Sequence, residues 1–277
     1  GWIDHVYANN AGIMMDRNLG ATSAAPGDVG AFGLMYQWGR KDPFMGSSAS
    51  SGTTLAASTG TWNVASSSNM MDFAEENPMT FATGWYGGSV PGEGWHTSES
   101  EKGLYDPCPV GYRVPDGGSD GFWATANVKS KGDSTNRGMY WTLADGETTA
   151  WYPAVGYRSI GSESLDYVGE YGYCWSASPY PSDIRHACAL SIHYSGRGGP
   201  ASNGYRSYGY SVRCVQDIEV VPEPDDPATS QILYTSTDGN VVTPFSSTVF
   251  GANIVSNTYE NGQGVIVFDG ELKKVDS

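Results

Sequence analysis

Several features that assign a chain to a common functional class are missing from this sequence of 277 residues. No apolar run approaches the roughly 20 residues that a helix needs to span a bilayer. Motifs of zinc proteases, P-loop nucleotide-binding proteins, serine hydrolases and EF-hand calcium sites are absent. Cysteine pairs with CxxC spacing are absent as well. We therefore expect no enzyme activity, no cofactor, no metal site and no membrane span.

Positive charge is scarce. The chain has 15 Lys and Arg residues against 30 Asp and Glu residues, a net charge of −15. Such a balance disfavours nucleic acid and anionic membrane surfaces as partners. The nearest match to a phosphate-binding loop, GRGGPA at residues 196–201, contains a proline and precedes no helical pattern, which indicates a chance match.

Glycine and aromatic residues are abundant instead. With 37 Gly, 18 Tyr and 9 Trp, the chain has too much buriable area for a disordered composition. This composition predicts loops and turns held in place by aromatic side chains. Because the chain begins at Gly1 without Met, we expect a processed form of a secreted or surface-displayed protein.

Four cysteines, Cys108, Cys174, Cys188 and Cys214, give an even count that favours an oxidising compartment. Four cysteines permit three pairings. Buried free thiols are an equally good interpretation of the same residues.

An acidic, proline-rich stretch at residues 218–230 divides the chain. Its three prolines prevent a continuous helix or central strand and produce a semi-rigid spacer. We expect one domain at residues 1–217 and a small β unit at residues 231–277. Predicted strands of the small unit span residues 231–237, 240–243, 265–268 and 271–275, the first two joined by an Asp-Gly hairpin turn.

Short strands dominate the pattern before the spacer, and long helical periodicity is nearly absent. Short helices are expected at residues 69–76 and after a turn at residues 115–121. The fold class that we expect is therefore α+β and loop-rich. The predicted strands span residues 12–16, 139–142, 151–155, 173–176, 187–193 and 210–215.

Four ordered motifs resemble a known family. They are MDRNLGA at residues 15–21, YQWGRKDPF at 36–44, DPCPVGYRVP at 106–115 and YSVRCV at 210–215. Together they resemble the Fibrobacter-type major paralogous domain over roughly residues 10–217. The resemblance implies a C-type-lectin-like fold related to formylglycine-generating enzymes. It also implies a place among secreted and fimbria-associated proteins of gut Bacteroidetes.

The same resemblance bears on the cysteines. It implies a disulfide between Cys108 and Cys214, which lie in two of the motifs. Cys174 and Cys188 lie on successive predicted strands and are candidates for a second bridge. The relation to formylglycine-generating enzymes leaves a copper-dependent oxidase as a remote alternative. Calcium-dependent sugar binding is not supported, because the Glu-Pro-Asn and Trp-Asn-Asp motifs of such lectins are absent from the last quarter of this domain.

The tail resembles a second family. YTSTDG at residues 234–239, VFGANI at 249–254 and GVIVFDG at 264–270 are similar to the segment that precedes the leucine-rich repeats of BspA-like surface proteins. This resemblance implies surface display.

Residues 171–215 differ in composition from the rest of the chain. They contain 7 Tyr, 8 Ser and 6 Gly, with four Arg and one acid, so this segment carries +3 within a chain of −15. Tyr provides rigid contact area, and Ser and Gly adapt to a partner, as in antibody paratopes. The segment also resembles the variable region of retroelement-diversified proteins. Tyr and Gly that merely fill a loop-rich core are the alternative.

Within this segment, alternation separates framework from contact positions. Arg113 and Arg213 match family motifs and are expected in the framework. The apolar positions expected in the core are Trp175, Ala187, Ala189, Leu190, Ile192, Val212 and Val215. The positions expected to contact a ligand are Pro179, Tyr180, Ser182, Asp183, Arg185 and His186 in one cluster, and Ser191, His193, Tyr194, Arg197, Asn203, Tyr205, Arg206 and Tyr208 in another.

These observations predict a surface protein for adhesion or recognition. The exposed Tyr and Arg side chains expected here are typical of binding hot spots. The local excess of Arg favours an anionic or carbonyl-rich protein or glycan partner. A fimbrial structural or tip subunit is the alternative.

Overall fold

The computed structural model describes residues 1–47, 59–61, 70–78, 80–85, 94–96, 101–127, 130–160, 165–217, 231–236, 238–243, 252–260 and 262–270. The chain forms two compact units, Gly1–Asp217 and Ile218–Ser277. The division falls where the acidic, proline-rich stretch begins.

The expected α+β fold class is wrong, because the described residues are mostly β-sheet. The α-helices among them, α1 (Met70–Glu76) and α2 (Phe122–Ala126), are short and lie at the two predicted positions. Helix α2 ends where Asn127 adopts a left-handed backbone (φ 39°) and donates its N–H to the carbonyl of Trp123. Extended structure prevails because apolar residues mostly alternate with polar ones instead of recurring every three or four positions.

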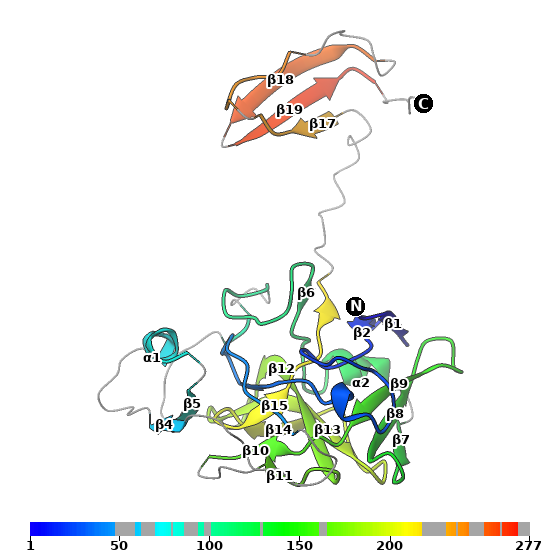
Figure 1. Cartoon of the computed structure of the whole chain (residues 1–277). Helices are drawn as coiled ribbons and strands as arrows, with labels where there is room; N and C mark the ends of the chain where they lie inside the picture. Colours follow the sequence, from blue (N-terminus) through cyan, green and yellow to red (C-terminus); the bar gives the residue numbers. More distant parts are fainter. Residues whose placement is uncertain are drawn as a thin grey trace. The chain divides into compact units, whose positions relative to one another are not determined.

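The largest sheet of the first unit has seven strands (Figure 1). All its pairings are antiparallel except that of β12 with β15. The last of these strands in sequence, β15, lies between β10 and β12, which precede it. The spatial order is β11 (Leu165–Asp166), β10 (Tyr157–Arg158), β15 (Gly209–Ser211), β12 (Tyr171–Pro179), β13 (His186–His193) and β14 (Ser202–Tyr205), with β3 (Met35–Gln37) also paired to β15.

Smaller sheets surround this one in the first unit. One has the order β1 (Asp4–Tyr7), β2 (Gly12–Met15), β16 (Val215–Gln216) and β6 (Tyr112–Arg113). A second consists of β7 (Ser130–Asp133), β8 (Gly138–Thr142) and β9 (Thr149–Pro153), and a third of β4 (Thr59–Thr61) and β5 (Phe81–Thr83). A 3-10 turn, η1, spans Val29–Ala31.

Side chains of β12 and β13 alternate between two hydrophobic clusters, one on each face of the seven-stranded sheet. Trp175 packs with Trp38, Trp95 and Tyr210 on one face. Cys174 lies on the other face, in a cluster with residues of α2, β8 and β9. Each of the seven apolar positions expected in the core is buried, so that prediction is confirmed.

The four motifs that carry the family resemblance meet one another in space. Tyr210 pairs with Tyr36, and Val215 pairs with Arg113. Asn18 accepts hydrogen bonds from the guanidinium of Arg213 at 3.0 and 3.2 Å. Arg213 is fully buried, as expected for a framework residue. The motifs therefore form the framework around the last strands of the unit.

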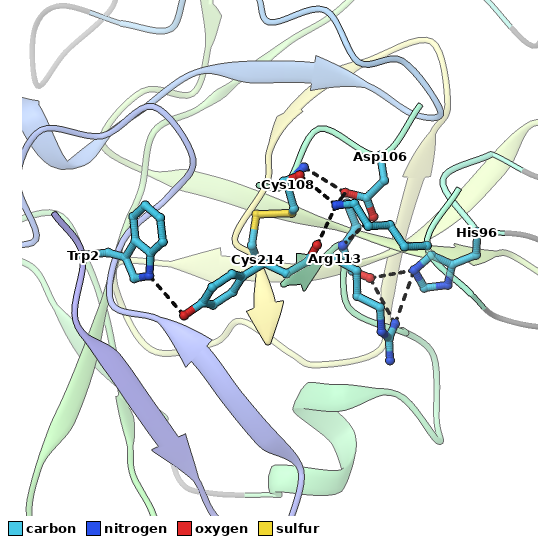
Figure 2. Close-up of a disulfide and its surroundings, with 9 residues drawn as sticks. Trp2, His96, Asp106, Cys108, Arg113 and Cys214 are labelled. Atoms are coloured by element: carbon cyan, nitrogen blue, oxygen red, sulfur yellow. Dashed lines mark hydrogen bonds and ion pairs between the residues drawn. A yellow bond between two sulfur atoms is a disulfide. The ribbon is translucent and has the colours of Figure 1, made fainter. Parts of the chain in front are cut away.

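A buried carboxylate folds the loop that carries Cys108 (Figure 2). The two oxygens of Asp106 accept hydrogen bonds from the backbone N–H groups of Cys108 and Val114, both at 2.8 Å. Lys102 donates to Asp106 at 3.1 Å and to the carbonyls of Cys108 and Tyr112. These charge-assisted hydrogen bonds fix the loop beside β16.

Cys108 and Cys214 form a disulfide, the pair that the family resemblance implies (Figure 2). The two residues are 106 positions apart, and a loop of that length stabilises a fold by about 4–5 kcal/mol in the chain-entropy model. The second candidate pair does not form, since Cys174 and Cys188 are buried free thiols. The reason is the strand register, which places Leu190 opposite Cys174.

The second unit is a three-stranded antiparallel sheet in the order β17 (Gln231–Tyr234), β19 (Gln263–Phe268) and β18 (Ile254–Glu260). The expected hairpin between residues 231–237 and 240–243 is wrong, because β17 pairs with β19 instead. The predicted strand at 271–275 lies outside the described residues. The small core consists of Ile232, Tyr234, Ala252, Ile254, Ile266 and Phe268.

None of the described helices has the length and apolar character needed to cross a membrane.

Candidate binding face

Seven tyrosines form a continuous network of ring contacts along the seven-stranded sheet. We call this network the tyrosine face. Its members are Tyr157, Tyr167, Tyr171, Tyr173, Tyr205, Tyr208 and Tyr210.

Strand alternation and strand order bring these residues together. Tyr171 and Tyr173 are two residues apart on β12, so both project from the same side of the strand. Tyr157 belongs to β10 and Tyr210 to β15, which lies between β10 and β12. Three strands that are distant in sequence thus place their tyrosines next to one another.

The rings contact each other closely. Tyr157 is nearly parallel to Tyr208, with a centroid distance of 5.5 Å and an angle of 9°, and to Tyr167, at 5.9 Å and 21°. It meets Tyr173 and Tyr210 edge to face. Stacked and edge-to-face pairs of this kind each contribute about 0.5–1.5 kcal/mol beyond the area that they bury.

Tyr210 is the base of the tyrosine face. Its ring is only 3% exposed and packs against Trp175 at 4.2 Å and Tyr173 at 4.6 Å. A Cβ atom at Gly204 would lie 2.2 Å from the hydroxyl oxygen of Tyr210. Only glycine on β14 therefore leaves room for this ring.

The outer rings are accessible. Tyr167 is 54% exposed and Tyr205 is 41% exposed, while Tyr157, Tyr173 and Tyr208 are half-buried. The described part of the chain gives the hydroxyls of these five residues no hydrogen-bond partner. Five phenolic groups are thus free to bond a ligand.

The hydroxyls of the three half-buried members, Tyr157, Tyr173 and Tyr208, stay protonated at neutral pH. Burial raises the pKa of Tyr157 to about 12, and the nearby Asp166 carboxylate adds to the effect. Burial also raises the pKa of Tyr173 and of Tyr208. Each of the three groups therefore both donates and accepts hydrogen bonds.

The first predicted contact cluster lies at the turn between β12 and β13. Asp183 accepts hydrogen bonds from the backbone N–H of Arg185 at 2.9 Å and from its guanidinium at 2.8 and 3.1 Å. These bonds hold the pKa of Asp183 well below its usual range. The ring of His186 packs at 4.1 Å from that of Tyr205, which joins this turn to the tyrosine face. Tyr180 is half-buried beside His186, and the neighbouring Pro179 and Ser182 are exposed.

The second predicted cluster is divided. His193 is buried, with Nδ1 2.6 Å from the hydroxyl of Ser195 and its ring 4.5 Å from that of Tyr171. Ser191 is half-buried and its hydroxyl accepts from the N–H of Gly199. His193 and Ser191 are therefore not open contact residues.

The remaining members of that cluster are accessible to different degrees. Arg197 is exposed, Tyr194 is half-buried beneath the guanidinium of Arg137, and Asn203 is half-buried on β14.

Arg206 is the clearest departure from the predicted contacts. It is 3% exposed, its guanidinium lies 4.2 Å from the ring centroid of Trp38, and its Nε donates to the carbonyl of His186 at 2.9 Å. The residue follows β14 and turns inward to the cluster around Trp38, because a planar guanidinium stacks on an indole ring. Arg206 belongs to the framework.

The expected cationic surface is therefore not present in that form. Two of the four arginines that gave the segment its +3 charge, Arg206 and Arg213, are buried. The exposed Arg185 is paired with Asp183, and Asp166 lies close to the tyrosines. Because only Arg185 and Arg197 of the four arginines are exposed, the local excess of Arg does not favour an anionic partner.

Sequence reasoning missed five of the seven members of the face. Tyr171, Tyr173 and Tyr210 lie within the segment but were not predicted as contacts. Tyr157 and Tyr167 were missed as well. Both precede residue 171, where the composition turns rich in Ser and Gly, and so lay outside the segment considered. A count of tyrosines alone would have extended the segment upstream to include them.

The face offers no reactive nucleophile among the cysteines. Burial raises the pKa of Cys174 to about 11, and it also raises the pKa of Cys188, so both are protonated thiols at neutral pH. A thiol must ionise to attack or to bind a metal. Within the described ranges, no group of three or more His, Cys, Asp or Glu residues is placed to hold a metal ion.

A cavity of about 300 Å³ lies apart from the tyrosine face. Its two acids are already engaged, since Asp42 pairs with Arg40 and Glu75 accepts from the hydroxyl of Tyr105 at 2.9 Å. None of the predicted contact residues is in its lining, which consists of Arg40, Lys41, Asp42, Ala74, Glu75, Pro78 and Tyr105.

The resemblance to the Fibrobacter-type major paralogous domain stands on its four motifs alone, since comparison with protein-family models, curated proteins and solved structures finds no match for this chain.

Proposed function

We propose that this chain is a secreted or surface-displayed binding protein that holds its ligand on the tyrosine face. One observation carries the proposal: accessible tyrosine rings packed into a rigid network, with hydroxyls that no other described residue uses. Rigid tyrosines lose little conformational entropy when they bind, and such residues dominate antibody paratopes and interface hot spots. The family resemblance, with its secreted and fimbria-associated members, agrees with this role.

The test compares two double variants of the full chain. Tyr167→Ala with Tyr205→Ala removes the two most exposed rings of the face, and Trp2→Ala with Leu104→Ala removes two exposed apolar side chains outside the face. Each protein is screened against a glycan microarray and against displayed peptides. We expect hits of the parent protein to be lost with the tyrosine variant and kept with the control. Hits that both variants keep, or no hits at all, would contradict the proposal.

A structural role in an assembly is the second candidate, and the second unit favours it. Strands β17 and β18 are the edges of its sheet, and neither has a second neighbour among the described residues. Leu233 and Val255, on these two strands, are 61% and 65% exposed. An open, apolar edge accepts a strand from another chain. Light scattering on the full chain should then show association, which Leu233→Lys abolishes; a monomer at all concentrations would contradict this role.

A further inference from the structure

The way in which the tyrosine rings pack determines which atoms a ligand meets. Tyr157 has parallel neighbours in Tyr167 and Tyr208 and perpendicular neighbours in Tyr173 and Tyr210. Four rings thus surround this half-buried ring and leave only part of it open. A sugar ring binds an aromatic residue by stacking on an open flat face, and the centre of this network offers little of that surface. Edges and free hydroxyls remain.

Charge contributes little to this surface. The exposed guanidinium of Arg185 makes a two-point ion pair with Asp183, and Arg206 is buried against Trp38. Asp166 accepts a hydrogen bond from Ser159 at 2.7 Å but has no ion-pair partner among the described residues, and its negative charge near Tyr157 and Tyr208 disfavours an acidic partner. An exposed, already paired charge adds little to affinity. A partner is therefore held mainly by apolar contact and by neutral hydrogen bonds.

The exposed rings of Tyr167 and Tyr205 give the face both apolar area and hydroxyl groups. Exposed aliphatic side chains occur close to the face in sequence. Ile184, at the turn that carries Arg185, is 47% exposed, and Ile160, which follows β10, is 44% exposed. A sugar has little apolar surface to match such rings, whereas a protein surface presents aliphatic side chains beside polar backbone groups.

We propose that the ligand of the tyrosine face is a protein, recognised through an uncharged patch of apolar side chains and exposed backbone amide groups. This inference rests on the proposed binding function and names its class of partner. Tyr167 and Tyr205 are the anchors, since they are the most exposed rings and each packs against a buried or half-buried neighbour that holds it in place. Hydroxyls of Tyr157 and Tyr208 supply hydrogen bonds between the two anchors.

The experiment selects from a phage library of random linear and cyclic peptides on the immobilised full chain, with the glycan microarray run in parallel. We expect selected peptides to be rich in apolar residues and low in charge. Their affinity should change by less than about 3-fold between roughly 0.05 and 0.5 M NaCl, because screening weakens only charge-based contacts. Tyr205→Ala or Tyr167→Ala should weaken binding by at least about 30-fold, as expected for a hot spot.

A conservative series separates hydroxyl from ring. Tyr157→Phe and Tyr208→Phe keep the stacked rings and remove one hydroxyl each, so each should weaken peptide binding by about 5-fold, the effect of one net hydrogen bond. Trp2→Ala, which lies before β1 and outside the tyrosine face, should leave binding unchanged, and thermal unfolding of every variant verifies the fold.

The outcomes distinguish this inference from the proposed function. Glycans that bind and are lost with the tyrosine variants, in the absence of peptides, would keep the binding function and overturn the protein partner. Peptides whose affinity falls steeply with salt would overturn recognition without charge. If neither collection yields a ligand that depends on Tyr167 and Tyr205, the proposed function itself fails.

Discussion

The aromatic residues of the first unit fall into two regions that differ in how their polar atoms are used. In the cluster around Trp38, the indole N–H groups of Trp38, Trp85, Trp95 and Trp175 each donate to a backbone carbonyl at 2.8–3.0 Å. On the tyrosine face, the outer hydroxyls have no described partner. The tryptophans therefore hold loops together, and the tyrosines remain free to meet a ligand.

Aromatic content alone therefore does not distinguish framework residues from residues available for ligand contact. A ring whose polar atom is bonded to the backbone is part of the framework, because removing it leaves a buried carbonyl unpaired as well as a cavity. A ring held only by other rings keeps its polar atom available. The difference between the regions predicts a descending series of effects on the stability of the first unit.

The largest effect should come from the disulfide that anchors the framework. Cys108→Ser with Cys214→Ser should lower the free energy of unfolding by about 4–5 kcal/mol, since the unfolded chain regains the entropy of a loop of 106 residues. Denaturant unfolding with and without a reducing agent measures this loss. The variant Cys188→Ala keeps the disulfide and should still respond to the reducing agent; equal stability of the oxidised and reduced parent would contradict the prediction.

Truncation of a framework ring should have the next largest effect. Trp38→Ala should cost about 3–5 kcal/mol, because it opens a cavity in the core and frees the carbonyl of Ser176. The loss is measured as a shift in the denaturation midpoint at constant slope. A cost below about 1 kcal/mol would mean that the cluster around Trp38 is not the framework.

A matched pair of arginines locates the boundary between the two regions. Arg206→Ala removes a stack on Trp38 and a hydrogen bond to the carbonyl of His186, and should cost about 2–3 kcal/mol. Arg185→Ala removes an exposed ion pair and should cost less than about 1 kcal/mol. Thermal unfolding of both variants measures the two losses. A larger loss with Arg185→Ala than with Arg206→Ala would mean that Arg206 is a contact residue and not part of the framework.

The strands and the core of this sheet could be predicted because alternation is local. Leu190 and Ile192 fall on one face of β13 by spacing alone, and their burial follows. Arg206 could not be predicted in the same way. It lies in the turn between β14 and β15, where no period applies and the direction of the side chain depends on Trp38, far away in the sequence.

In the second unit, the pairing between strands distant in sequence could not be predicted from the sequence either. The Asp-Gly turn at residues 238–239 is a strong local signal, yet Gln231–Tyr234 pairs with Gln263–Phe268, which supplies Ile266 and Phe268 to the core. Burial of those side chains outweighs the turn preference. Strand β18 was missed because polar residues interrupt its alternation.

Raising the pH above 10 should lower the free energy of unfolding by a smaller amount, through ionisation of the half-buried tyrosines. The folded-state pKa of Tyr157 is about 12 against 10 for an ordinary tyrosine, so its contribution to stability is complete below pH 10 and is lost as the pH rises toward 12. The free energy of unfolding should therefore fall more steeply above pH 10 in the parent than in Tyr157→Phe, which cannot ionise there. Parallel profiles from pH 8 to pH 11.5 would contradict the assignment.

Among the ring substitutions, the smallest effect on stability should come from the rim of the face. Tyr167→Ala should lower the free energy of unfolding by only about 1–2 kcal/mol, because it removes two ring contacts, with Tyr157 and Tyr171, while the ring itself is more than half exposed. The same substitution should abolish ligand binding, so binding and stability separate at this residue and coincide at Trp38. Denaturant unfolding and peptide binding are measured on the same preparation, with Trp2→Ala as control. A loss of several kcal/mol with Tyr167→Ala would place this ring in the framework, and the division between the two regions would then lie further out along the sheet.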